Sequence, residues 1–92
     1  MAVAPQASRA RIDAVPNLAT VGPYRFFFYS NEGGEPAHVH VRRERKVAKF
    51  WLDPVEHADS KRFAAHELRE IEQIVQDRRD DFLEAWNEYF SG

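Results

Sequence analysis

The most constraining feature of this sequence is a change of hydrophobic period near residue 60. Before that point, apolar and aromatic residues fall in three short segments bounded by turn-forming residues, and an alternating pattern of this kind is typical of strands with one buried face. The three predicted strands are Tyr24 to Ser30, His38 to Arg42 or Arg43, and Lys46 or Val47 to Leu52. Because only short turns or loops separate them, they predict an antiparallel meander.

After a loop through His57 and Ser60, from about Ala65 to Tyr89, the apolar residues recur at the spacing of one helical face. The members of this stripe are Leu68, Ile71, Val75, Phe82, Trp86 and Tyr89 or Phe90. Arg78 and Arg79 interrupt the stripe and Asp80 is a candidate N-cap, so one long helix and two helices bent there both fit. The predicted fold class is α+β: a three-stranded antiparallel meander, packed on one face by a C-terminal amphipathic helix that is kinked or split in two.

A chain of 92 residues supports one domain with a modest core. We predict a flexible N-terminal arm over residues 1–16 and a single domain over residues 17–91. The absence of cysteine excludes disulfides and thiolate metal sites. No apolar run approaches the length of a signal core or a membrane span, so we expect a cytoplasmic protein that does not enter membranes. A small domain of limited stability also predicts a homodimer or a protein partner.

Charge is unevenly distributed along the chain. Residues 1–51 carry eight basic and four acidic residues, a net charge of +4, whereas residues 52–92 carry five basic and eleven acidic ones, a net charge of −6. This asymmetry predicts a basic sheet and an acidic helical region. The two regions can pair with each other, or the sheet can meet an anionic partner.

Alternation along the strands separates an apolar face from a second, polar and aromatic one. If the apolar set packs against the helices, the other face displays His38 and His40 together with a candidate binding set, Arg25, Phe27, Tyr29, Arg42, Lys49 and Trp51. Such a surface needs a cover, because exposed aromatic clusters are unfavourable in water. A partner protein, a second copy of the chain or single-stranded RNA would each fit, since rings stack on bases and cations bind phosphates.

Two histidines one residue apart, His38 and His40, are the candidate catalytic residues. As general acid and base they could cleave RNA without a metal, aided by the cations nearby. As metal ligands they lack a third partner that the spacing identifies: His57, His66, Glu32 and Glu35 are all available, so we assign no metal and no cofactor. The remaining interpretation is a hydrogen-bonded pair in a polar or interface setting.

Three motifs together resemble the DUF4160 family of small bacterial proteins of unknown function. They are YRFFFYSNEG followed by EPAHVHV, the segment AKFWLDPV, and ELREIE, and the resemblance extends from about Pro16 to Phe90. The sequence departs from the family's usual pattern at Ala37, where proline is common, and at Ala64, where serine is common. The second departure would remove a Ser-x-x-Glu capping box with Glu67, an effect of about 1 kcal/mol.

The resemblance implies a bacterial cytoplasmic protein that is commonly encoded beside another small protein, such as a DUF2442 member, as in toxin–antitoxin operons. Two functional hypotheses follow. The first is a binding component of such a two-protein system, which uses the aromatic and basic sheet face to bind its partner, itself or RNA. The second is a metal-independent ribonuclease toxin in which His38 and His40 act as general acid and base.

Overall fold

The computed structural model describes residues 17–91 of the chain. The predicted N-terminal arm, residues 1–16, lies outside the described residues. The elements in chain order are β1 (Asn17–Val21), β2 (Tyr24–Phe27), β3 (His38–Arg43), β4 (Lys46–Leu52), β5 (Val55–Lys61), α2 (Ala65–Asp77) and α3 (Arg79–Phe90).

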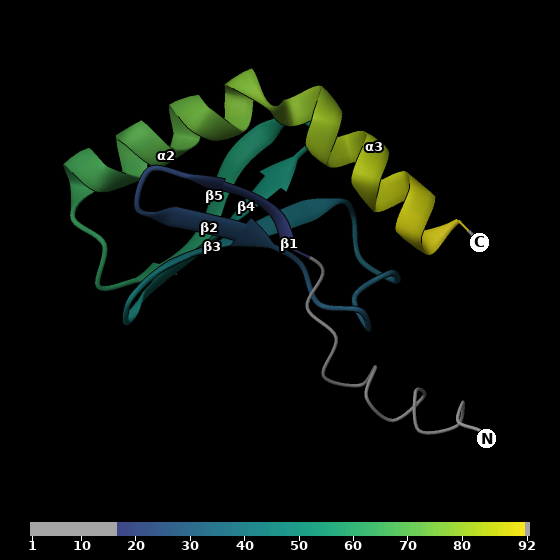
Figure 1. Ribbon diagram of the computed structural model, residues 1–92, viewed down its shortest axis with the longest axis horizontal. Coiled ribbons are helices and arrows are strands. Elements are labelled where there is room, and N and C mark those ends of the chain that lie inside the picture. The colour runs from purple at the N-terminus through teal and green to yellow at the C-terminus, as the bar shows by residue number, and fades with distance from the viewer. Residues whose placement is uncertain (1–16, 92) are drawn as a thin grey trace.

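The strands form one antiparallel sheet in the order β1-β2-β3-β4-β5, with α2 and α3 lying end to end along one side of it (Figure 1). The α+β class and the meander are therefore confirmed, but the prediction of three strands was wrong because the sheet has five. Strand β5 was missed because its sequence, VEHADSK, has no alternating apolar residues. It is held instead by backbone pairing with β4, and a polar sequence suits an edge strand because it discourages further pairing.

Short turns connect most neighbouring strands. The β1–β2 turn uses Gly22 with a φ of 59°, and the β3–β4 turn uses Glu44 with the same φ, so the chain reverses tightly at both places. Asp53 and Pro54 follow β4 and turn the chain directly into β5. The long connection is the β2–β3 loop, residues 28–37, which leaves room for side chains to fold back over the sheet.

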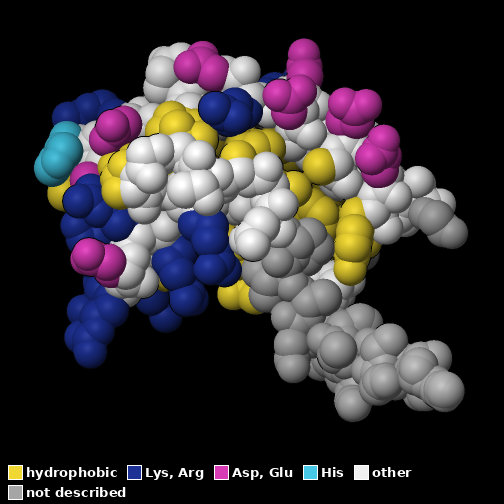
Figure 2. Space-filling view, in the orientation of Figure 1, with side chains coloured by type: hydrophobic (Ala, Val, Ile, Leu, Met, Phe, Trp, Pro, Cys, Tyr) yellow, Lys and Arg dark blue, Asp and Glu magenta, His cyan; other side chains and the backbone are white. Residues whose placement is uncertain are grey.

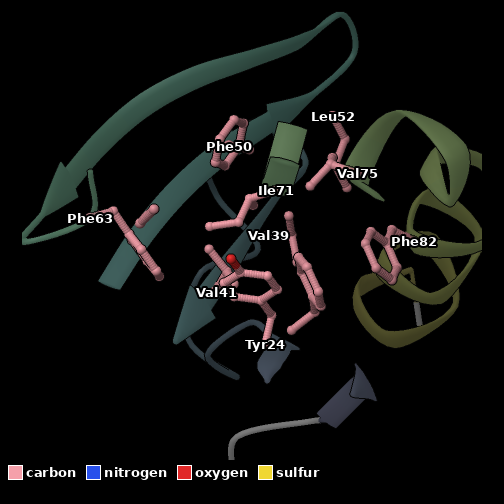
Figure 3. Close-up of a cluster of buried hydrophobic side chains, with 11 residues drawn as sticks. Tyr24, Val39, Val41, Phe50, Leu52, Phe63, Ile71, Val75 and Phe82 are labelled. Atoms are coloured by element: carbon pink, nitrogen blue, oxygen red, sulfur yellow. The ribbon is translucent and has the colours of Figure 1, made fainter. Parts of the chain in front are cut away.

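The core lies between the sheet and the two helices (Figure 3). From α2, Ile71 and Val75 point into the sheet, where Val39 and Phe50 lie on adjacent strands, and all four side chains are fully buried. From α3, the Phe82 ring lies 5.5 Å from that of Phe26 on β2. The predicted apolar faces of the strands are thus the ones that contact the helices.

Two helices are present rather than one long helix, since Arg78 interrupts them with φ −109° and ψ 12°. Asp80 does not cap α3 but pairs with Arg79, whose guanidinium lies 3.1 Å from it. At the start of α2, Ala64 has the extended backbone of an N-cap and its amide donates to Glu67 at 3.0 Å, so half of the capping box survives without a hydroxyl. Within residues 17–91, neither helix has the length and apolar character that a membrane span requires.

Candidate functional site

The face of the sheet opposite the helices, which we call the open face, is organised in rows across the strands. Strand pairing places Arg25 on β2 opposite Arg42 on β3. Val47 on β4 is the cross-strand partner of Arg42 on one side and of Lys61 on β5 on the other. We call Arg25, Arg42 and Lys61 the cationic row. The next row contains Phe27, His40 and Lys49, because Phe27 pairs with His40 and His40 with Lys49.

Within residues 17–91, no acidic side chain balances the cationic row. All three of its members are exposed, and none of them forms an ion pair with an acidic residue of segment 17–91. By contrast, Lys49 in the next row is paired with Glu35 at 2.8 Å. The cationic row is therefore available to an anion from outside the described chain.

A second feature is a cluster of three side chains, Glu32, His38 and His40. One nitrogen from each histidine and one oxygen from the carboxylate all lie within 4.8 Å of one another. The carboxylate lies between the two rings, with Oε1 3.0 Å from His38 Nε2 and Oε2 2.9 Å from His40 Nε2. We call this set the Glu–His–His cluster.

His38 is fully buried, with 0% of its surface exposed. Its ring packs against two indoles, and its centre lies 5.7 Å from that of Trp51 on β4 and 4.8 Å from that of Trp86 on α3. Nδ1 lies 3.0 Å from the carbonyl oxygen of Pro36, whereas Nε2 makes no hydrogen bond within the described structure despite its closeness to Glu32. The ring is thus held on one side and has an unsatisfied nitrogen on the other.

The β2–β3 loop places Glu32 over the two histidines. The Glu32 carboxylate accepts a hydrogen bond of 2.9 Å from the Tyr29 amide, which fixes the turn that carries it. The next residue, Gly33, lies against Phe90 of α3 so closely that an added Cβ would meet that ring at 2.5 Å. Glycine at this position therefore lets the end of α3 press the loop towards the sheet.

Electrostatics favour the ionised form of Glu32 and the neutral form of His40. Burial favours the protonated form of Glu32, but hydrogen bonds from the Tyr29 amide and from His40 outweigh it and lower the pKa of that carboxyl. Burial lowers the pKa of His40, because it disfavours the charged imidazolium, although the hydrogen bond to Glu32 and its negative charge act in the opposite direction. At neutral pH the carboxylate is ionised and the His40 ring is neutral, so one nitrogen of that ring retains a free electron pair.

The candidate binding set lies largely on the open face, as predicted, but its rings are less accessible than the sequence indicated. Phe27 is only 2% exposed, with the His40 ring stacked on it at 5.5 Å. Trp51 is half-buried, and the Lys49 ammonium lies 4.5 Å from its ring centre. Tyr29 remains 38% exposed.

Two members of the site were not singled out from the sequence. Glu32 was one of four possible third partners for the histidines, and only the folded loop distinguishes it from Glu35, His57 and His66. Trp86 was assigned to the helical stripe, yet its ring also covers His38. The signal available for Glu32 was its place in a glycine-rich loop directly before the His-x-His strand.

Comparison with known proteins adds a family but no activity. Residues 24–87 match the family model described as a domain of unknown function, DUF4160. No curated protein and no solved structure matches the chain. The match spans most of the sequence, and it includes the Glu–His–His cluster and most of the open face. The chain therefore belongs to the DUF4160 family.

Proposed function

We propose that this protein is the binding component of a two-protein, toxin–antitoxin-like system, and that its open face binds an acidic surface of the partner protein. The observation that carries the proposal is the cationic row, in which Arg25 and Arg42 are directly opposed and no acidic residue of segment 17–91 pairs with them. Like charges facing each other on adjacent strands are destabilising. A carboxylate-bearing partner would turn this unfavourable arrangement into a favourable one.

The distribution of charge over the whole domain supports the same orientation. Figure 2 shows acidic side chains along the helix layer and basic side chains below them, towards the sheet. An acidic partner would be attracted to the sheet side and repelled from the helix side. The separation of charge therefore directs the approach of the partner as well as its final contacts.

An acidic protein fits this face better than the other two candidates. Single-stranded RNA would need accessible rings, but Phe27 is buried and Lys49 occupies a face of Trp51. A two-fold homodimer through the open face would bring two cationic rows towards each other, because such an interface uses the same patch on both copies. A separate protein with carboxylates meets neither obstacle.

The alternative of a metal-independent ribonuclease receives less support from the geometry. A general acid or base must reach the proton that it transfers. The His38 ring is fully buried between Trp51 and Trp86, so only His40 is accessible to a substrate on this surface. A mechanism that needs both imidazoles would require this end of the domain to open.

The test is co-expression of the chain with the small protein encoded beside it, followed by co-purification and measurement of affinity. We expect a stable complex, and we expect the double variant R25S/R42S to weaken it by about tenfold, equivalent to about 1.4 kcal/mol. The matched control, R45S/R69S, removes two arginines that lie outside the open face and should leave the affinity unchanged. Equal weakening by both doubles, or binding of RNA but not of the protein, would contradict the proposal.

The biological role is tested by growth. Induction of the wild-type chain alone should not arrest a bacterial host, whereas co-induction should relieve any arrest that the neighbouring protein causes. R25S/R42S should lose this relief and R45S/R69S should keep it. Arrest by the wild-type chain alone that H38A and H40A both relieve would instead support the ribonuclease.

A further inference from the structure

We propose that Glu32, His38 and His40 form a binding site for a divalent first-row transition metal ion. The inference concerns the Glu–His–His cluster alone and does not depend on what binds the cationic row. It rests on the type of donor atoms, the orientation of the rings and the distances between them.

The orientation of His38 is the first argument. The Pro36 carbonyl oxygen can only accept, so His38 Nδ1, 3.0 Å away, must be the nitrogen that carries hydrogen. In the neutral ring Nε2 then carries the lone pair, and it lies 3.0 Å from Glu32 Oε1 without a hydrogen bond between the two atoms. Two acceptors this close repel each other unless they share a proton or a metal cation. Metal-bound histidines commonly donate their second nitrogen to a backbone carbonyl in this way.

The distances are the second argument. Metal–nitrogen and metal–oxygen bonds in protein zinc sites are about 2.0–2.2 Å long, so two ligand atoms lie about 3.4 Å apart at the tetrahedral angle and about 3.0 Å apart at right angles. The carboxylate oxygens lie 3.0 Å from His38 Nε2 and 2.9 Å from His40 Nε2. Since all three ligand atoms lie within 4.8 Å of one another, binding would require the two rings to approach each other by a small movement. The hydrogen that His40 Nε2 donates to Glu32 would move to Nδ1 or to solvent, because a ligating nitrogen must be deprotonated.

The burial of His38 is the third argument, because a histidine that served only to hydrogen-bond Glu32 would not need to be buried. Glu32 and His40 already satisfy each other, but the buried Nε2 of His38 stays without a partner within residues 17–91. An unsatisfied buried polar atom is costly, and an apolar residue between Trp51 and Trp86 would avoid that cost. A histidine here is explained if its free nitrogen binds a ligand.

The donor set selects the class of metal. Two imidazoles and one carboxylate suit zinc, iron, cobalt or nickel, whereas calcium and magnesium prefer oxygen donors alone. Three protein ligands leave at least one coordination position open. The side chains of His40 and Glu32 are 18% and 14% exposed, so water can reach that position from the open face. A shallow pocket of about 130 Å³, lined partly by His40, Lys49 and Lys61, adjoins it.

The experiment measures binding of Zn²⁺ and Co²⁺ to the full chain, purified without a histidine tag and stripped with a chelator. We expect one ion per chain by calorimetry, a visible Co²⁺ absorption spectrum, and a rise in Tm of about 10 °C at 100-fold excess over Kd. E32Q and H40Q should each weaken binding by about 100-fold or more. Loss of a residue that only hydrogen-bonds to a metal ligand costs about 10–100-fold in affinity, and loss of a ligand itself should cost more.

Two control variants make the result specific. H66Q removes an exposed histidine on α2, and E35Q removes the neighbouring carboxylate of the same loop; both should bind Zn²⁺ as the wild type does. Because H38A can disturb packing, E32Q, which keeps the shape of the side chain, is the decisive variant, with folding checked by circular dichroism. Failure of folded wild type to bind either ion, or equal binding by E32Q and H66Q, would show a hydrogen-bonded cluster only and overturn the proposal.

Discussion

The helix-facing side of the sheet and the open face differ in how far the chain satisfies its own side chains. On the helix-facing side, Ile71, Val75 and Phe82 fill the space against the strands, and the buried side chains there are almost all apolar. On the open face, the cationic row has no acidic partner within residues 17–91, and His38 is buried with an unsatisfied nitrogen. The first side accounts for the fold, and the second has features that folding alone does not require.

This difference gives each side an expected response to substitution. Truncation on the helix-facing side should reduce stability, because apolar contacts are lost and a cavity forms. Removal of charge from the open face should cost little or even stabilise the domain, since functional sites often retain unfavourable arrangements. Three predictions test this comparison, beginning with the largest effect.

Ile71→Ala should destabilise the domain by about 2–5 kcal/mol, because Ile71 is fully buried at the centre of the helix–sheet contact. Urea unfolding followed by circular dichroism measures the loss. Ile74→Ala on the same helix is the control: its side chain is half-buried, so its loss should be clearly smaller. Equal losses would mean that the core does not lie between α2 and the sheet.

Charges that tie α2 to the sheet provide the second test, at Glu67. The Ala64 amide donates to this carboxylate, and Lys46 and Arg43 lie 3.0 Å and 3.4 Å from it, so the pKa of Glu67 is lowered. A lowered pKa means that the ionised form stabilises the fold above the unfolded-state pKa of about 4.3, and that this contribution is lost as the pH falls through the folded-state pKa.

Glu67→Gln should therefore destabilise the protein at pH 7, by less than Ile71→Ala, and the difference from wild type should shrink below about pH 4. Thermal unfolding of both proteins between pH 7 and pH 3 measures it. Glu70→Gln, at the next acidic residue of α2, is the control, because Glu70 accepts a hydrogen bond from Tyr24 and forms no ion pair with a basic residue of segment 17–91. A wild-type-to-Gln difference that is constant with pH would show that the charge of Glu67 does not stabilise the contact.

The same two sides also differ in what sequence could predict. Period-two alternation identified the apolar face of β3 and β4, and helical spacing identified Ile71 and Val75, because burial imposes those periods directly. Strand β5 escaped prediction because backbone pairing to a neighbour leaves no apolar period in the sequence. The surviving half of the capping box at Ala64 shows a similar limit, since Glu67 bonds to a backbone amide whatever the N-cap side chain is.

For the site, alternation correctly placed His40 and Arg42 on the open face, but it could not predict the depth of burial. His38 is covered by Trp86, which is distant in sequence and reaches it only because α3 turns at Arg78. Glu32 joins the histidines through the fold of a loop, which follows no period. Contacts made by loops and by the ends of helices are decided by tertiary packing, so the hydrophobic period of the sequence does not predict them.

The smallest expected effect is at the cationic row, and it has the opposite sign to the first two. Arg42→Gln should stabilise the isolated domain by about 0.3 kcal/mol, because it removes repulsion from Arg25 directly across the strand pair. For a domain of this size that corresponds to a rise in Tm of about 1–2 °C.

Arg45→Gln, in the exposed β3–β4 turn and without an opposed arginine, should leave Tm unchanged. High salt shortens the Debye length to about 3 Å at 1 M, so the gain should disappear there. If Arg42→Gln instead lowered Tm at both salt concentrations, Arg42 would be stabilising the sheet, and the separation of the two faces into one for folding and one for binding would be wrong.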